Sequence, residues 1–393
     1  MARVEAIAAP ILLVWARERA GYTIEQAAGR LPVLPERLAA WEAGMARPTV
    51  KQLRRLGGIY GRPLAVFYLP EPPRGPQQPL RDHRRIWGEE PEGISPTLRK
   101  EIDIAEDRRE LALELLSLQD EEPPTLRLRA RLDEDPNAVA ARFRRKLGIT
   151  VEHQLGWSAR YDGFNAWRDA IEKIGALVLQ MTDVPIAEAR GFSISDRPLP
   201  AVVANIKDSP RARSFTLIHE LTHVALHESG VCTLDDAERI EVFCNRVAGA
   251  VLVPADVLRA EEVVREHGSE PEWADREIEG LARRFSVSRE VVLRRLLILG
   301  RTDQAFYQRK RNEYIEEYRE AEERRKSEPT EPRPIPRDLI AVARTGQYLS
   351  LLVLSSYARG RITASDVADY FGIRIKHLAA VERRVFGAPP QTE

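Results

Sequence analysis

The first 69 residues alternate short apolar stretches with residues that start or break helices. The spacing of the apolar positions predicts four helices, over residues 10–19, 23–30, 35–44 and 49–59. Thr23 and Gln26 match a capping box, in which each side chain bonds the backbone of the other residue. Pro35 suits a first helical turn, and Thr49 suits the cap of the last helix. We therefore expect a compact helical domain here.

Two proline-rich segments divide the rest of the chain. Prolines are frequent and apolar residues few from 70 to 96, and four prolines lie between 327 and 336. Such a composition is typical of linkers. The predicted organisation is an N-terminal domain over 1–69, a linker over 70–96, a core with helical extensions over 97–326, and a C-terminal helical unit over 337–393.

The core combines helical spacing with a little strand pattern. Helical spacing covers residues 98–118, 137–147 and much of 255–326. Two short apolar runs, 176–179 and 201–204, suit buried strands. The chain is therefore predicted to be mostly α, of the α+β class, with a small sheet.

Composition narrows the class of protein. Hydrophobic residues make up 43% of the 393 residues, which predicts a globular chain, and 60 basic residues balance 60 acidic ones. Without net charge, only local patches can attract nucleic acid or a membrane. Two cysteines are too few for a disulfide framework. No basic-then-apolar leader opens the chain, and no run of about 18 apolar residues occurs. We expect a cytoplasmic protein with no membrane partner.

Three of the seven histidines share one helical stripe, at positions 219, 223 and 227. His219 and His223 enclose Glu220 in an H-E-x-x-H pattern, and side chains four residues apart lie on one helical face. Two imidazoles so placed can bind one metal ion, and the glutamate between them can take a proton from a water that the metal activates. The pattern predicts Zn²⁺ with Glu220 as the catalytic base, rather than hydrogen-bonded core histidines.

His227 is a poor third ligand. At a rise of about 1.5 Å per residue it lies about 12 Å from His219 along a straight helix. We expect it behind the ligands or facing the substrate. The donor that stabilises the oxyanion stays open among Tyr161, Asn205, Ser214 and His227.

A helical segment over 240–254 offers a better third ligand. Glu241 and Asn245 share one face of it. We predict Glu241 as the third ligand and expect Asn245 to orient a liganding histidine by accepting its outer N–H. Alternative acidic ligands are Asp235, Asp236 and Glu238.

Five segments between residues 140 and 300 share the pattern of one known family. The segments are residues 141–148, 191–193, 202–205, 213–223 and 241–254. Together they resemble the ImmA/IrrE family of zinc metallopeptidases, which implies a zincin-like core. The resemblance also implies His219, His223 and Glu241 as ligands and Glu220 as the catalytic glutamate. Thr222 and Cys244 replace the family's usual glycine and alanine.

Residues 10–69 resemble an XRE-type helix-turn-helix domain through the segments 23–28, 38–44 and 47–49. Residues 1–70 contain ten Lys or Arg and five Glu. Arg37 is predicted to read a guanine, and Arg47 and Lys51 to contact phosphates of double-stranded DNA. The alternative is that this domain packs against a protein, either a repressor or its own copy in a homodimer, and that its basic residues are only solvated.

The resemblance implies a function as well as a fold. Members of the family cut XRE-type repressors or provoke their cutting, so we expect a zinc-dependent endopeptidase with one protein substrate in stress or mobile-element regulation. The alternative is a non-catalytic transcriptional regulator or antitoxin-like binder that keeps the fold as a sensor or scaffold. The unit over 337–393 is either another helix-turn-helix-like module or a packing or dimerisation element.

Overall fold

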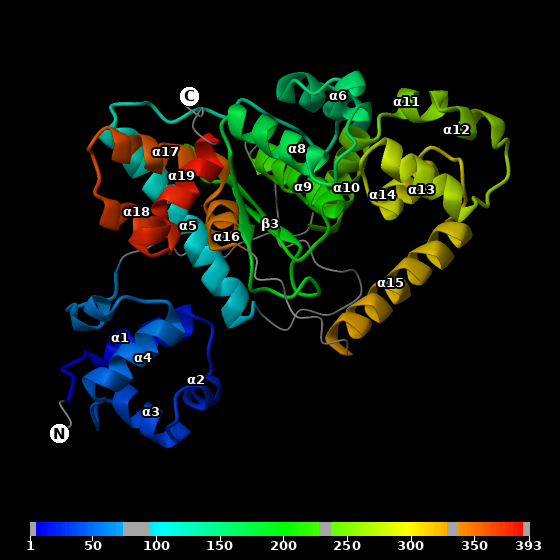
Figure 1. The fold of residues 1–393 in the computed structure, drawn as a ribbon. Coiled ribbons are helices and arrows are strands. Elements are labelled where there is room, and N and C mark those ends of the chain that lie inside the picture. Colours follow the sequence, from blue (N-terminus) through cyan, green and yellow to red (C-terminus); the bar gives the residue numbers. More distant parts are fainter. Residues whose placement is uncertain (1–4, 74–93, 228–236, 328–335, 388–393) are drawn as a thin grey trace. The chain divides into compact units, whose positions relative to one another are not determined.

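The computed structural model describes residues 5–73, 94–227, 237–327 and 336–387, which group into two compact units (Figure 1). Among these, unit 1 holds the residues up to 107 and unit 2 those from 108 onward. The helix α5 (Pro96–Leu118) supplies residues to both units. The described elements are mostly helices with one small sheet, which confirms the mostly α, α+β prediction. The predicted domain boundaries stay a prediction.

Unit 1 contains the four predicted helices near their predicted positions. They are α1 (Pro10–Arg19), α2 (Ile24–Arg30), α3 (Pro35–Glu42) and α4 (Val50–Tyr60), followed by the 3-10 helix η1 (Leu64–Tyr68). Both capping boxes form, and the Gln26 backbone N–H donates to Thr23 Oγ1 at 3.2 Å. The partly buried pair between Arg17 Nε and Glu42 Oε1, at 2.8 Å, joins α1 to α3. Local capping and one ion pair thus fix a small domain around the buried Trp41.

The sheet of unit 2 has three short buried strands, β1 (Leu177–Met181), β2 (Gly191–Ile194) and β3 (Ala201–Asn205), in the order β1-β3-β2. β1 runs parallel to β3, and β2 runs antiparallel to it. The two predicted strands correspond to β1 and β3. The four residues of β2 carry no apolar run, so the pattern gave no sign of this edge strand.

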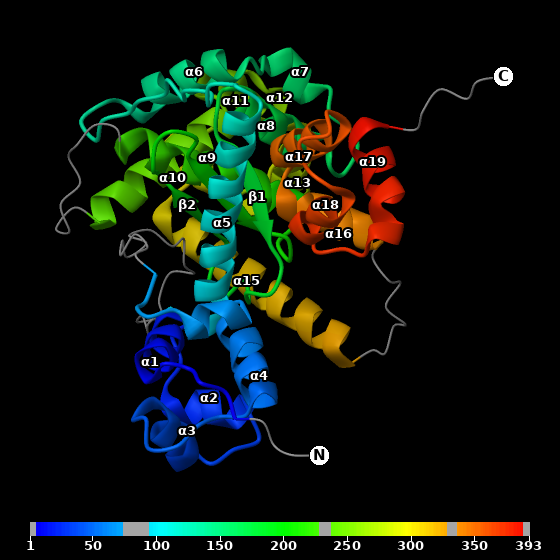
Figure 2. The same cartoon turned by 90° about the vertical axis from the view of Figure 1, so that its left-hand side faces the viewer.

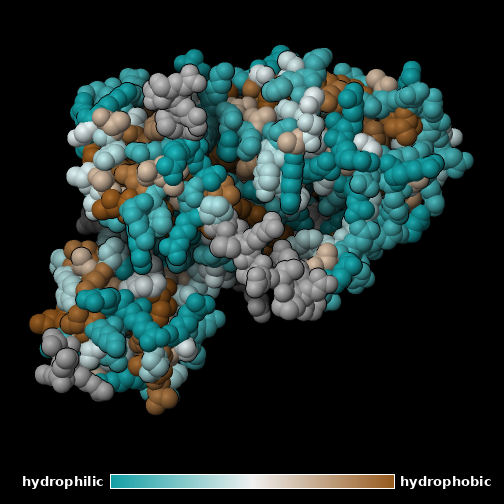
Figure 3. Space-filling view, viewed as in Figure 1, coloured by the Kyte–Doolittle hydropathy of each residue, from teal (hydrophilic) through white to brown (hydrophobic). Residues whose placement is uncertain are grey.

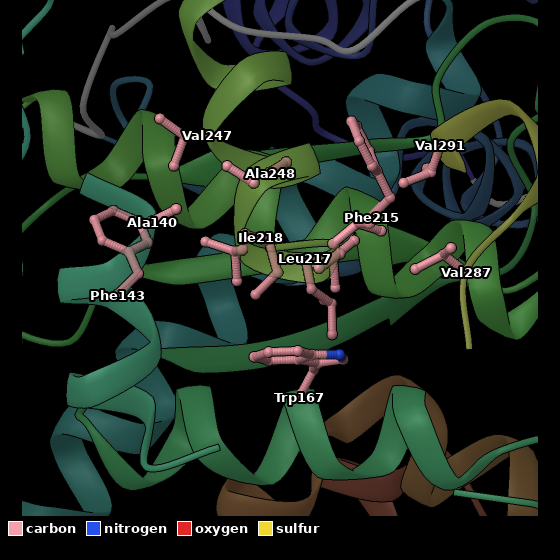
Figure 4. Close-up of a cluster of buried hydrophobic side chains, with 14 of the residues drawn as sticks. Ala140, Phe143, Trp167, Phe215, Leu217, Ile218, Val247, Ala248, Val287 and Val291 are labelled. Carbon is pink, nitrogen blue, oxygen red and sulfur yellow. The ribbon is translucent and has the colours of Figure 1, made fainter. Parts of the chain in front are cut away.

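Helices surround the sheet and continue away from it. They are α6 (Pro136–Leu147), α7 (Val151–Leu155), α8 (Asp162–Lys173), α9 (Pro210–His227), α10 (Ala237–Leu252), α11 (Ala255–Ala260), α12 (Glu262–Glu266), α13 (Asp275–Arg284), α14 (Arg289–Ile298) and α15 (Gln304–Ser327). The core forms where α8 and α10 pack on α9 and α6 packs against α10 and α8. Figure 4 shows Trp167 of α8 directed toward Leu217 and Ile218 of α9.

The last helices belong to unit 2. They are α16 (Arg337–Thr345), α17 (Gln347–Ala358), α18 (Ala364–Phe371), the 3-10 helix η3 (Ile375–His377) and α19 (Leu378–Phe386). Helices α16 and α17 contact β1 (Figure 2). The Tyr348 N–H donates to Glu172 Oε1 at 3.1 Å, and burial raises the pKa of Glu172 to about 7. This C-terminal group therefore packs on the sheet.

Close backbone contact explains the glycine between α16 and α17. Gly346 has φ +82°, and a Cβ built there would lie 2.5 Å from the Val178 carbonyl oxygen of β1.

No single described helix is long and apolar enough to cross a membrane. The pair α16 and α17, bent by 103°, passes that test by length and composition alone.

The first residue of β2 lies directly against α9. A Cβ built at Gly191 would lie 2.3 Å from Thr216 Cγ2 and 2.6 Å from the Val203 carbonyl oxygen. Real Cβ atoms essentially never approach that closely, and a backbone oxygen cannot turn aside as a long side chain can. Only glycine therefore lets β2 pair with β3 while α9 packs across both.

We predict that Gly191→Ala lowers the free energy of unfolding by about 1–3 kcal/mol, since the added methyl overpacks a buried contact. Urea denaturation followed by circular dichroism measures the change. Gly280→Ala is the matched control, because no atom lies within 4 Å of a Cβ built there in α13. It should leave stability unchanged or raise it by up to about 1 kcal/mol, the helical preference for alanine. Equal stability of wild type and Gly191→Ala would contradict the packing.

Candidate metal centre

Helix α9 is apolar around most of its circumference and is buried accordingly. It packs between the strands β2 and β3 and the helices α8 and α10. The Ser209 hydroxyl accepts from the Ala212 N–H at 3.2 Å, which satisfies a backbone donor at its start. His219 is 0% exposed, Glu220 1% and His223 5%. Three polar groups thus lie on a buried helix, where only specific partners offset their loss of water.

Three ligand atoms converge at this helix. His219 Nε2 and His223 Nε2 lie 3.0 Å apart. Glu241 of α10 brings one carboxylate oxygen to 3.1 Å from His223 Nε2 and the other to 3.4 Å from His219 Nε2. Ligands about 2.1 Å from a tetrahedral ion lie about 3.4 Å apart, so this spacing fits a zinc ion. Two imidazoles with one carboxylate are also a donor set of catalytic zinc sites, which leave a position open for water.

The electrostatics of Glu241 agree with a cation site. Burial opposes ionisation of its carboxyl, but hydrogen bonds and charge from the two histidines outweigh burial and hold its pKa well below the usual range. The carboxylate is therefore charged at neutral pH, as a ligand must be. Its side chain is 28% exposed, whereas the two histidines are buried, so Glu241 is the member of the group that solvent reaches.

Glu220 lies next to the edge strand β2. A Cβ built at Gly191 would lie 3.5 Å from Glu220 Cγ. The close approach of β2 therefore sets the wall beside this carboxyl.

The far end of α10 is fixed by buried cations. Arg144 Nη1 donates to the Val251 carbonyl at 2.7 Å, and Arg295 Nε donates to the Val253 carbonyl at 2.8 Å. Gln154 Nε2 donates to the intervening Leu252 carbonyl at 2.8 Å. Burial lowers the pKa of each arginine to about 10, so both stay charged at neutral pH. These contacts hold the helix that carries the third ligand.

These positioning residues escaped the sequence analysis because arginine is usually a surface residue. One sign was present. Arg144 lies on the same face of α6 as the buried Ala140 and Leu147, at helical spacings of four and three. A charged residue on an apolar face indicates a buried partner.

The predicted neighbours of the ligands behave differently from one another. Asn245 is nearly buried one turn after Glu241, and among the described residues it forms no hydrogen bond with His219 or His223. His227 is the last residue of α9, and its side chain lies outside the described residues, as do Asp235 and Asp236. Glu238 is exposed and is not part of the ligand group found among the described residues.

Two of the candidate oxyanion donors are committed elsewhere. The Asn205 amide donates to the Val184 and Ala189 carbonyls, at 3.0 and 2.9 Å, and so holds the loop after β1. The Ser214 hydroxyl donates to the Pro210 carbonyl at 3.1 Å. Tyr161 is 47% exposed near the buried Arg213.

The two departures from the family pattern are compatible with packing. The Thr222 hydroxyl donates to the Ile218 carbonyl at 2.8 Å, so its polar atom is satisfied within the helix. Cys244 is fully buried in the apolar core. Neither side chain is one of the three grouped ligands.

The predicted DNA-contacting residues lie in unit 1. Arg37 is on α3, Lys51 on α4 and Arg47 between them, and all three are exposed. Side chains that contact DNA phosphates and side chains that are only solvated are both exposed, so exposure fits the DNA-binding interpretation and the alternative equally.

Comparison with known proteins bears on the metal centre. No curated protein sequence matches the chain. Residues 175–297 match the family model Peptidase_M78, described as the IrrE N-terminal-like domain. The matched segment runs from just before β1 into α14, so it includes the sheet, α9 and α10. The match supports the resemblance to the ImmA/IrrE family and indicates a metallopeptidase-like function for this segment.

Proposed function

We propose that this protein is a zinc-dependent endopeptidase that cleaves a specific protein, an XRE-type repressor, and that unit 1 couples cleavage to regulation. The observation that carries the proposal is the meeting of His219, His223 and Glu241, with all three ligand atoms within 4.8 Å of one another. A purely structural site would use Cys and His ligands and would not need a buried glutamate inside the histidine pair. The match over residues 175–297 supports the reaction class.

Zn²⁺ held by these three residues supplies Lewis acidity, which polarises a carbonyl and lowers the pKa of water. Glu220 takes a proton from the attacking water and returns it to the leaving amine, so its carboxyl is first acceptor and then donor. Glu241 would be ionised while it holds the ion, since a carboxylate binds a metal in its deprotonated form.

Unit 1 is the recognition module in this proposal. Arg37, Arg47 and Lys51 provide cationic contacts to double-stranded DNA. Exposed apolar side chains support the alternative partner, a protein or a second copy: Ile7 is 75% exposed, Leu34 72% and Met45 79%. Figure 3 shows hydrophobic residues, coloured brown, on the surface of this unit. DNA is the partner we propose first, since basic side chains outnumber acidic ones two to one over residues 1–70.

We expect about one zinc ion per wild-type chain. His223→Ala and Glu241→Ala should each weaken zinc affinity by about 10²-fold or more, because losing a direct ligand costs more than losing a residue that only supports a ligand. Elemental analysis and competition with a chelator measure both quantities. Glu238→Ala is the matched control, an exposed acid on the same helix. Zinc lost from Glu238→Ala but kept by Glu241→Ala would show that the third ligand is misassigned.

We expect Glu220→Gln to keep its zinc and to lose cleavage by about 10²–10⁴-fold, the usual contribution of a general base. The amide has the same shape but cannot accept the proton. The assay incubates each protein with XRE-type repressors encoded in the same genome and identifies fragments by mass spectrometry. If regulation in cells is intact in Glu220→Gln while zinc binding is unchanged, the protein is a metal-bearing scaffold or binder and not a peptidase.

For the DNA-binding proposal, Arg37→Ala should relax discrimination at one base pair by about 1–3 kcal/mol. Lys51→Ala should weaken all duplexes alike and reduce the slope of log affinity against log salt by about 1. Binding is measured with duplex DNA that the full-length protein selects from a random library. Failure of the full-length protein to bind any duplex would assign unit 1 to a protein partner, whereas equal affinity for all duplexes would leave the phosphate contacts and remove the base reading by Arg37.

A further inference from the structure

A large groove lies on unit 2 outside the ligand group. Its volume is about 1250 Å³. The extended segment 125–134 forms much of its wall, with residues from the last turns of α6, the end of α9 and the start of α10. In Figure 2 this segment is the teal trace between α5 and α6. None of its lining residues takes part in the chemistry proposed above.

The wall segment alternates apolar and basic side chains. Leu126, Leu128 and Ala130 are buried, and the arginines that alternate with them at 127, 129 and 131 are exposed. This period of two is that of an extended chain with one face on the core. The Ala130 N–H donates to the Ala225 carbonyl of α9 at 3.2 Å, which ties the segment to the metal-binding helix. A fixed backbone therefore presents a row of arginines to the groove.

The charge of the groove is strongly one-sided. Seven basic side chains line it, against two acidic ones. Asp133 pairs with Arg131 at 3.0 Å and Glu134 pairs with Arg142 at 2.6 Å, and these arginines hold the pKa of both carboxyls below the usual range. The acids are therefore ionised but already neutralised by neighbours.

Three further cations of the groove are available to a ligand. Within the described part of the chain, Arg127, Arg145 and Lys146 form no ion pair, and all three are exposed. Their parallel display along one groove in a chain of zero net charge is a local feature, not a consequence of composition. An anionic partner would gain contacts here that no other group in the described residues already supplies.

The groove also adjoins the ligand-bearing helices. Leu226 lines it three residues after His223, and Arg239 lines it two residues before Glu241. At about 1.5 Å per residue these positions lie roughly one turn or less from the ligands along their helices. A chain bound in the groove would thus pass close to the metal centre.

We propose that this groove binds an acidic, extended segment of the protein substrate and so selects what the metal centre cleaves. The proposal rests on the proposed peptidase function. An extended acidic peptide fits this wall, since its carboxylates would meet the exposed arginines while the leucines that alternate with them face the core. A peptide is favoured over nucleic acid because the groove adjoins the two helices that carry the ligands of the proposed peptidase.

The test measures binding and not cleavage. The full-length Glu220→Gln protein is titrated into a fluorescein-labelled twelve-residue peptide of alternating Glu and Val, and fluorescence anisotropy is recorded at several salt concentrations. Arg127→Glu with Arg145→Glu should weaken binding by at least about tenfold, since two attractions become repulsions. The double change to Gln should give a smaller loss in the same direction. Circular dichroism and zinc content verify that both variants fold.

A matched control changes charge elsewhere on unit 2. Arg265→Glu with Arg276→Glu alters two exposed arginines of α12 and α13 and should change affinity by less than about twofold. Equal losses in the control pair, or equal binding of a Gln-Val peptide, would overturn the proposal. Tighter binding of a twelve-nucleotide single strand, lost in the same groove variants, would overturn it in favour of nucleic acid. Absence of any peptidase activity would not change these binding outcomes, so the two proposals fail separately.

Discussion

The metal centre depends on how the end of α10 is capped. The last carbonyls of a helix have no partners within it, and a buried carbonyl without a partner costs about 1–3 kcal/mol. Here Arg144, Gln154 and Arg295, from three other helices, donate to three successive carbonyls. Each donor is nearly buried, so each needs these acceptors as much as the carbonyls need donors. The position of α10, and with it Glu241, follows from this mutual requirement.

A fixed α10 matters because the ligands come from two helices. His219 and His223 are set by the geometry of α9 alone, since residues four apart share a face. Glu241 meets them only if α10 lies against α9 at the right place along its axis. Glycine at 191 contributes from the opposite side, because it lets β2 press on α9 beside Glu220. The three candidate ligands are thus held between a strand and a capped helix, an arrangement that fixes the geometry of a site independently of any bound ion.

The sequence predicted what local rules control. Helices with caps, the H-E-x-x-H stripe and two apolar strands all depend on residues within one turn or one short run. Helical spacing and family resemblance predicted Glu241 as a ligand. Its contact with His223, 18 residues earlier in the chain, depends on how α10 packs against α9, which no local pattern specifies. Edge strand β2 escaped prediction since four residues without an apolar run look like a loop. Arg144 escaped because no local rule separates a buried arginine from a solvated one.

Zero net charge concealed a strong separation of charge in this chain. Basic residues outnumber acidic ones over residues 1–70 and along the groove beside α6, whereas acidic residues balance them elsewhere in the sequence. Screening confines the influence of an exposed charge to about 8–10 Å in physiological salt, so distant acids cannot cancel these local fields. An approaching anion therefore meets a cationic surface and not a neutral protein. For this reason the net charge of the chain does not predict its partners. They are inferred from where the charged side chains lie.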